Sequence, residues 1–353
     1  MLPRGMKLLP ASVSAMFLLA FNLSGTVGAQ TTLVKVTPLG SHPGELCLED
    51  RALLFEDPSG VRILYDPGFT TDETDPRLGD VHVALLSHAH VDHIGPNRPN
   101  RGGGTCAAPG RGATNANSNF ASIAAAKNAM TFVTSELIGF MGQKIQAAGG
   151  TAAPACPTSG FDNETTVPTS APCIAAFGPG ASRMIRRAGA SAGVRIIGVQ
   201  ALHPNSVPAA LIDPPLPSGI SGYAGVAMGF VVQFTNGLTA YLTGDTGVFG
   251  DMGQVISKFY NPSLVVMNIG PGGQGPTSLG PVDGGNVLYA FIRPATVIPS
   301  HVQEQATSGG RVRTNTRTEL FMRSAGPYAA VVLPVSDVTM MFDGEGRCVG
   351  CPR

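Results

Sequence analysis

The stretch 87–95, which reads S-H-A-H-V-D-H-I-G, constrains this chain more than any other part of its sequence. His88, His90, Asp92 and His93 stand close together there, directly after an apolar run. Imidazole and carboxylate groups are the ligands that zinc and similar divalent metals prefer. Side chains two residues apart on an extended segment point the same way, so His88 and His90 are expected to meet at one ion. A helix that begins at Asp92 would turn that residue and His93 toward a second ion.

Short apolar runs separated by Gly and Pro turns indicate β-strands in much of the chain. Four runs precede or deliver the histidine-rich loop, at 33–36, 52–55, 61–65 and 81–86, and a helix is expected near 250–260. Asn236-Gly237 separates two later runs and indicates a β-hairpin. Three further strand-like runs end beside a residue able to bind metal: His203 after 194–202, Asp245 after 238–242, and His301 after 295–299. These three residues are therefore candidates to complete a metal site.

The motif H-x-H-x-D-H, followed by a lone His, an Asp after Gly and a final His, resembles the metallo-β-lactamase superfamily. The resemblance covers most of residues 32–305. It implies an α/β fold, an αββα sandwich of two mixed β-sheets flanked by helices. The segments G-D-T-G, N-I-G and P-S-H look most like the branch of lactonases and phospholipase D-like enzymes.

The same resemblance implies a role for each candidate ligand. It assigns His88, His90 and His203 to a first metal, Asp92, His93 and His301 to a second, and Asp245 to a bridge between them. Two divalent ions are expected, zinc first, with Mn²⁺ or Fe²⁺ as alternatives. Asp92 and Asp245 are then catalytic as well as ligating, and no serine or cysteine nucleophile is needed.

Three other residues near the motifs have open or structural interpretations. An aspartate at the position of Asp66 typically supports a metal-binding histidine in this superfamily, although a plain Asp-Pro-Gly turn is equally compatible with the sequence. His42 and His82 match no family position, so we interpret both as structural.

We expect a hydrolase that uses a metal-bridging hydroxide to cleave a lactone, an ester or a phosphodiester. The alternatives within the superfamily are a β-lactam hydrolase and a mononuclear iron sulfur dioxygenase. A metal-stabilised binding protein is disfavoured, because the expected ligands leave a solvent position open between the metals, as catalytic sites do. Asp245 argues against a true β-lactamase of the H-x-H-x-D-H type, since those enzymes generally lack the bridging aspartate.

Composition points to a small-molecule substrate. Basic and acidic residues balance at 23 each, so nothing indicates a nucleic-acid surface. The loops 204–223 and 270–281 are the candidate pocket walls, and both are apolar, rich in Gly and Pro, and without Lys or Arg. Tyr223 is a candidate substrate contact. Gly270, Gly272 and Gly275 match G-x-G-x-x-G, but the prolines that follow disfavour a nucleotide-binding helix.

The first 29 residues have the pattern of a signal peptide. Arg4 and Lys7 form a basic start, 12–21 an apolar run too short for a comfortable membrane span, and 27–29 a small-residue cleavage site. We therefore predict an exported protein, periplasmic or secreted, with no stable membrane insertion and one domain at 30–353.

Residues 97–180 interrupt the strand pattern and are predicted to be a loop-rich insertion. Apolar residues at helical spacing over 123–145 predict one helix within it. In an oxidising compartment the six cysteines are predicted to form disulfides, with the pairing left open.

We predict that the mature protein begins near Gln30. The measurement is the intact mass and N-terminal sequence of the protein recovered from the exported fraction. A protein that still carries residues 1–29 there would contradict the prediction.

Overall fold

The computed structural model describes residues 32–99, 106, 111–114, 117–217, 219–270 and 278–351. These residues belong to one compact unit, which begins at Thr32. The predicted signal peptide at 1–29 lies outside the described residues, as do Gly272 and Gly275 of the glycine motif.

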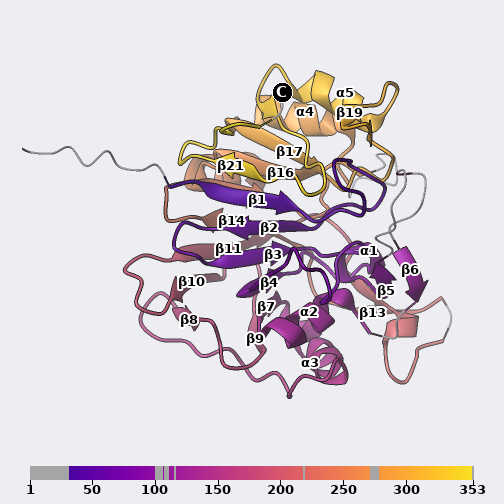
Figure 1. Ribbon diagram of the computed structural model, residues 1–353, viewed down its shortest axis with the longest axis vertical. Coiled ribbons are helices and arrows are strands. Elements are labelled where there is room, and N and C mark those ends of the chain that lie inside the picture. Colours follow the sequence, from indigo (N-terminus) through magenta and orange to yellow (C-terminus); the bar gives the residue numbers. More distant parts are fainter. Residues whose placement is uncertain are drawn as a thin grey trace, which may run out of the picture. The chain divides into compact units, whose positions relative to one another are not determined.

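Within these residues the strands form two large sheets, seen in Figure 1. The first sheet has the strand order β21-β1-β2-β3-β4-β7-β9. Strands β1 to β3 are antiparallel neighbours, whereas β3, β4, β7 and β9 run parallel. The bounds are β1 (Val34–Pro38), β2 (Leu53–Glu56), β3 (Arg62–Tyr65), β4 (Val83–Leu85), β7 (Met130–Val133), β9 (Cys173–Ala176) and β21 (Met340–Phe342).

The second sheet has the strand order β20-β17-β16-β15-β14-β11-β10-β8. Strands β14 and β15 form the hairpin predicted at Asn236-Gly237, and β15, β16, β17 and β20 run parallel. The bounds are β8 (Thr165–Val167), β10 (Ser182–Arg187), β11 (Val194–Gln200), β14 (Met228–Gln233), β15 (Thr239–Leu242), β16 (Leu264–Asn268), β17 (Thr296–Ser300) and β20 (Ala330–Val331).

Alternating side chains on these strands create a core between the sheets and a second apolar layer outside each. On β3, Ile63 joins the cluster between the sheets and Leu64 packs on the other face. On β16, Val266 lies in the inner cluster and Val265 in the outer one. Each sheet therefore needs helices to cover its outer face.

The helices supply those outer layers. Phe120 of α2 and Met141 of α3 pack with Ala84 of the first sheet, and Leu288 of α4 and Phe321 of α5 pack outside the second sheet. The bounds are α1 (Val91–Ile94), α2 (Asn119–Lys127), α3 (Ile138–Ala147), α4 (Pro281–Ala290) and α5 (Arg317–Ala325), with 3₁₀ turns η1 (Ser135–Leu137) and η2 (Ala209–Leu211). The helix expected near 250–260 is η3 (Met252–Tyr260), with π-type hydrogen bonding. The predicted αββα sandwich is confirmed.

Two-stranded ribbons decorate the sandwich: β5 (Asn97–Pro99) with β6 (Arg111–Thr114), β12 (Ser206–Pro208) with β13 (Ser221–Tyr223), and β18 (Thr307–Ser308) with β19 (Arg311–Val312). The pair β12 and β13 belongs to the expected pocket-wall loop 204–223.

The prediction of a single helix over 123–145 is wrong. Helix α2 ends at Lys127, because Asn128 turns the chain with a left-handed φ of 50°. Met130–Val133 then forms the strand β7, and α3 begins after it. All four residues of β7 are buried, and a strand covered on both faces satisfies helical spacing without being a helix.

Residues 97–180 also contribute to the sandwich itself. Strands β7 and β9 of the first sheet and helices α2 and α3 all lie within this segment. The stretch 148–164 contains no helix or extended strand. The limits of an insertion here stay a prediction.

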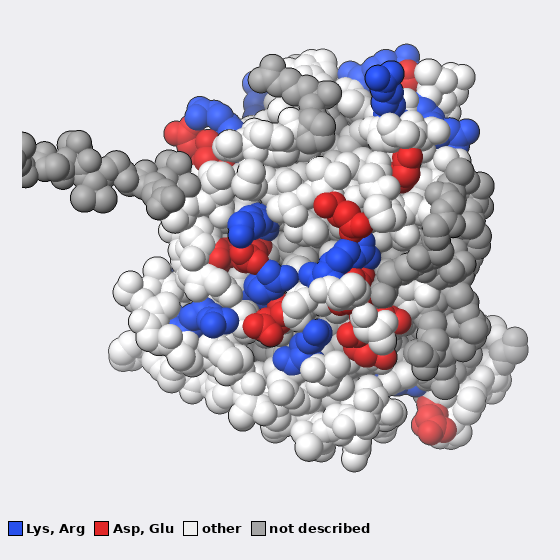
Figure 2. All heavy atoms as spheres, in the orientation of Figure 1, with Lys and Arg blue, Asp and Glu red and all other residues white. Residues whose placement is uncertain are grey.

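The six cysteines are paired as Cys47–Cys106, Cys156–Cys173 and Cys348–Cys351. None of the helices in the described part of the chain is long and apolar enough to span a bilayer. On the face shown in Figure 2, acidic and basic side chains are interspersed rather than segregated.

We expect a non-reducing peptide map of the purified protein to recover these three cysteine pairs. The Cα atoms of the pairs lie 5.0, 4.8 and 5.7 Å apart, within the range of about 4.4–6.8 Å that disulfides span. Six free thiols in the non-reduced protein, or a different set of cysteine pairs, would contradict this arrangement.

Candidate metal centre

The candidate site lies where the carboxyl ends of strands from both sheets meet. Tyr65 of β3 pairs with Leu85 of β4, so Asp66 and the histidine-rich loop leave the first sheet side by side. Asn268 of β16 pairs with Ser300 of β17, so His301 leaves the second sheet beside Asn268. A hydrogen bond of 2.9 Å from the Met228 amide to the Ser87 carbonyl joins the two edges.

The structure brings together all seven residues predicted as metal ligands. Their donor atoms fall into three overlapping groups, each within 4.8 Å: a first group of His88, His90 and His203, a second group of Asp92, His93 and His301, and a linking group of His88, His93 and Asp245. Residues up to 213 positions apart in the sequence therefore share one site, since His88 and His301 both contribute.

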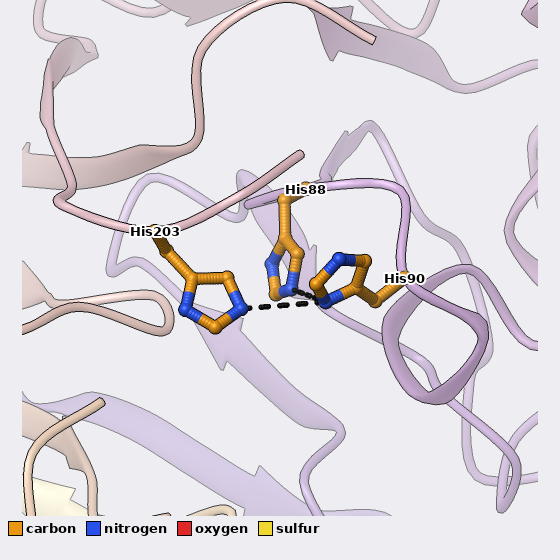
Figure 3. A group of neighbouring side chains, drawn as sticks. All are labelled: His88, His90 and His203. Atoms are coloured by element: carbon orange, nitrogen blue, oxygen red, sulfur yellow. Dashed lines mark hydrogen bonds between the residues drawn. The ribbon is translucent and has the colours of Figure 1, made fainter. Parts of the chain in front are cut away.

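The first group consists of three histidines whose nitrogens converge, as Figure 3 shows. His90 Nδ1 lies 3.0 Å from His88 Nε2 and 3.3 Å from His203 Nε2. Burial, and then the nearby imidazoles, lower the pKa of His88 well below 6.5 and the pKa of His90 to about 4. These two rings are therefore neutral at pH 7, which is the form that binds metal.

The donor set fits a metal ion at this group. Nitrogens bound to a tetrahedral zinc at about 2.0–2.1 Å lie roughly 3.3 Å from each other. The observed separations of 3.0 and 3.3 Å match that edge length. A hydrogen bond can join only two of these nitrogens at a time, because at most one proton fits between each pair. A single metal cation can bind all three nitrogens at once.

Asp245 lies between the first and second groups. Its Oδ2 is 3.2 Å from His301 Nε2, 3.5 Å from His93 Nε2 and 3.7 Å from His203 Nε2. Its Oδ1 accepts a hydrogen bond of 2.8 Å from Asn268 Nδ2. Burial by itself raises the pKa of Asp245, but His301 and His93 outweigh it and hold that pKa well below 3.8. Because Asn268 holds Oδ1, the other oxygen of Asp245, Oδ2, can face both groups.

Glycine and tyrosine set the backbone that delivers Asp245. Gly244 adopts a φ of 61°, and a Cβ there would lie 2.5 Å from the Met228 carbonyl. The Gly244 amide donates to the Tyr65 hydroxyl at 3.1 Å. A side chain at position 244 would therefore push Asp245 away from the histidines.

The second group is held from behind by Asp66. Asp66 Oδ2 lies 2.8 Å from His93 Nδ1, and its two oxygens also accept from the amide and hydroxyl of Ser87 at 2.8 and 2.6 Å. This arrangement keeps the His93 proton on Nδ1 and leaves Nε2 as an acceptor. Asp66 thus lies behind His93, with both of its oxygens engaged by Ser87 and by His93 Nδ1.

Asp92 and His301 complete the second group. His301 Nε2 lies 3.0 Å from Asp92 Oδ2, and His301 reaches it by adopting a left-handed φ of 56° directly after β17. Burial raises the pKa of Asp92, but Arg51 and the nearby imidazoles outweigh it and hold that pKa well below 3.8. Asp92 is therefore ionised and able to ligate a cation.

Arg51 is the residue that sequence reasoning missed at this site. Its Nη1 donates to Asp92 Oδ2 at 2.9 Å and lies 2.8 Å from His93 Nε2. Burial lowers the pKa of His93, but Asp245 and Asp66 outweigh it and raise that pKa to about 9. A protonated His93 cannot accept a hydrogen bond at Nε2, so the Arg51 contact belongs to the neutral ring that metal binding also requires.

Asn205 was also missed, and it ties the expected pocket wall to the metal loop. Its Oδ1 accepts from the Ala89 amide, between His88 and His90, at 2.8 Å. Its Nδ2 donates to the carbonyls of Ala224 and Val226. A polar residue two positions after a ligand histidine was the available signal.

The remaining predicted residues lie as follows. Tyr223 is on β13 opposite Ser206 and is 73% exposed, and its contact with substrate stays a prediction. His82 Nδ1 accepts from the Arg62 amide at 2.9 Å, and His42 Nδ1 lies 2.9 Å from the Ser41 hydroxyl. Neither His42 nor His82 belongs to the three donor groups.

We predict that Asp245→Asn lowers the bound metal from about two ions per chain to one or fewer, and lowers turnover at least about 100-fold. Asn keeps the shape of the side chain but removes the charge that faces both groups. Elemental analysis and an activity assay measure the two effects. His82→Ala, which removes another buried histidine, is the control and should retain its metal; equal metal loss in both variants would refute the assignment.

No protein-family model matches the chain. It is 28% identical over 306 residues to a UPF0173 metal-dependent hydrolase of Cupriavidus necator. The matched region covers 84% of this chain and 85% of that protein. Among solved structures, the metallo hydrolase Igni18 of Ignicoccus hospitalis has a TM-score of 0.53 at 20% identity, covering 88% of this chain and 99% of its own. An isothiocyanate hydrolase from Delia radicum gut bacteria has a TM-score of 0.50 at 18% identity, covering 88% and 99%.

The two structural likenesses bear on the fold alone, and they agree with the sandwich described above. The relative from Cupriavidus necator adds a similarity over most of both sequences. Together with the order of the ligand motifs, these findings identify the chain as a metal-dependent hydrolase with the metallo-β-lactamase fold.

Proposed function

We propose that this chain is an exported hydrolase that holds two divalent ions, zinc first, and cleaves a lactone, an ester or a phosphodiester. The observation that carries the proposal is the position of Asp245 Oδ2, which faces ligand nitrogens of both groups at 3.2–3.9 Å. A carboxylate oxygen in that place suits a bridge between two cations.

Each predicted ligand has a distinct place in this proposal. The histidines of the first group hold one ion, Asp92, His93 and His301 hold the other, and Asp245 spans both. Bound there, two ions would lower the pKa of a shared water and polarise the electrophilic centre of the substrate. The ions supply this chemistry, so the protein needs no covalent nucleophile.

The side chains around the ligands fix their orientation. Asp66 holds the tautomer of His93, and Asn268 holds one oxygen of Asp245. The side chain of Asp92 is 20% exposed, against 8% for Asp245. Asp92 is therefore the more solvent-accessible of the two carboxylates.

The wall at 204–223 favours a compact substrate without high negative charge. Asn205 anchors this loop to the metal loop, and the loop contains no Lys or Arg. Ile220 and Tyr223 are exposed on it, at 51% and 73%. Apolar walls of this kind suit a lactone, an ester or a small phosphodiester, as in the branch of lactonases and phospholipase D-like enzymes, better than a polyanion.

Export is the part of the proposal that rests on sequence. The leader at 1–29 and the pairing of all six cysteines support an oxidising location, periplasmic or secreted.

The test is a parallel panel of lactones, aryl esters, phosphodiesters and a chromogenic cephalosporin, assayed with metal-loaded and chelated protein. We expect chelation-sensitive turnover of at least one of the first three classes, well above that of the cephalosporin. Asp245→Asn should lose this turnover and His82→Ala should keep it.

Two results would overturn the proposal. Cephalosporin turnover above every other class would make the protein a β-lactam hydrolase. Oxygen consumption with a persulfide substrate and one bound iron would make it a sulfur dioxygenase.

A further inference from the structure

Arg51 places a fixed positive charge inside the second ligand group. It lies two residues before the first residue of β2, and its side chain is only 2% exposed. One nitrogen, Nη1, contacts two expected ligand atoms at once, Asp92 Oδ2 at 2.9 Å and His93 Nε2 at 2.8 Å. A guanidinium stays charged at any physiological pH, so this cation is permanent.

The guanidinium is sealed from solvent and confined. A Cβ at Gly68 would lie 3.1 Å from Arg51 Cδ, so the arginine stem packs directly on this glycine. Arg51 Nε and Nη2 are buried and have no hydrogen-bond partner among the described residues. A solvent-borne substrate cannot reach these atoms, which directs the effect of Arg51 to the ligands it touches.

Arg51 and a second metal ion need the same lone pair. In the neutral form of His93, the proton lies on Nδ1, which faces Asp66, and the acceptor lone pair lies on Nε2. The Nη1–H of Arg51 points at this nitrogen, and a metal ion would bind it at about 2.0–2.1 Å. A second ion must therefore displace the Arg51 contact before it binds His93.

Charge acts in the same direction. One divalent ion together with Arg51 balances the charge of three carboxylates, the buried Asp66 and Asp245 and the 20% exposed Asp92. A second divalent ion would leave an excess of positive charge in a site largely removed from water. Arg51 contacts Asp92 and His93, so its charge and its hydrogen bond compete with an ion at the second group.

We propose that Arg51 makes the two metal positions unequal. The first group binds metal at lower concentration. The second group binds metal only at higher concentration, because the ion has to displace Arg51 Nη1 from His93 Nε2. Arg51 is thus a positioning residue that sets the order and the affinity gap of metal binding. This inference rests on the two-ion site of the proposed function, but not on its substrate.

The experiment is a titration of chelator-stripped full-length protein with Zn²⁺ alone, followed by calorimetry with a competing chelator. We expect two steps in the wild type, the second at least about 10-fold weaker. Arg51→Met keeps the stem but removes the charge and the donors, so its second step should tighten about 10-fold or more while its first step changes much less. Arg51→Lys keeps the charge but not the planar fork, and its second step should fall between the two.

Arg77→Met is the control, because Arg77 is another ion-paired arginine, 21% exposed, that contacts Asp75 and Asp337 rather than the candidate ligands. It should leave both steps at wild-type values. Two equal steps in the wild type, or a second step unchanged in both Arg51 variants, would overturn the inference. If Arg51→Met does not fold, the wild-type gap and the Arg51→Lys value decide.

The same samples are assayed with the substrate panel. Unequal steps that respond to Arg51, without turnover of any substrate, would leave this inference standing and remove the proposed function. Turnover of a substrate, together with a difference in metal affinity that is unchanged in the Arg51 variants, would support the proposed function and overturn this inference.

Discussion

Compensation of buried negative charge organises this molecule. The buried Asp66 and Asp245 lie together with the 20% exposed Asp92 at the meeting edge of two sheets, and an unpaired buried carboxylate costs on the order of several kcal/mol. Each has its own fixed partner: Ser87 for Asp66, Arg51 for Asp92 and Asn268 for Asp245. These partners take one oxygen or one side of each carboxylate. The direction left open is the direction in which the histidines converge.

Much of the fold and most of the ligand set were accessible from sequence. The strand runs were recognisable because each is a short apolar segment between turn residues, and β11, β15 and β17 end close to where the pattern predicts. The ligand residues were recognisable because H-x-H-x-D-H packs much of a metal site into a few residues. His203, Asp245 and His301 could be added because each follows a strand, and parallel strands share an edge.

What sequence could not supply depends on contacts between distant segments. Arg51 precedes an ordinary apolar strand, and nothing local distinguishes it from a surface arginine; only the pairing of β2 with β3 brings it to the loop that carries Asp92. Asn268 closes a buried strand, and its role appears only when the end of β15 lies beside it. The single helix predicted over 123–145 failed for a related reason, since burial on both faces of β7 is a tertiary property.

The in-register pairing of β15, β16 and β17 has a consequence for how such a chain can change over evolutionary time. Asn268 and Ser300 form the last pair of β16 and β17, His301 directly follows that pair, and Asp245 lies three residues beyond the last paired residue of β15. Deleting one residue inside a strand would shift that end by about 3.3 Å and turn the side chain to the opposite face. Apolar identities within the strands are then free to drift, and connecting loops are free to lengthen. The number of residues in each strand is the quantity that selection has to preserve.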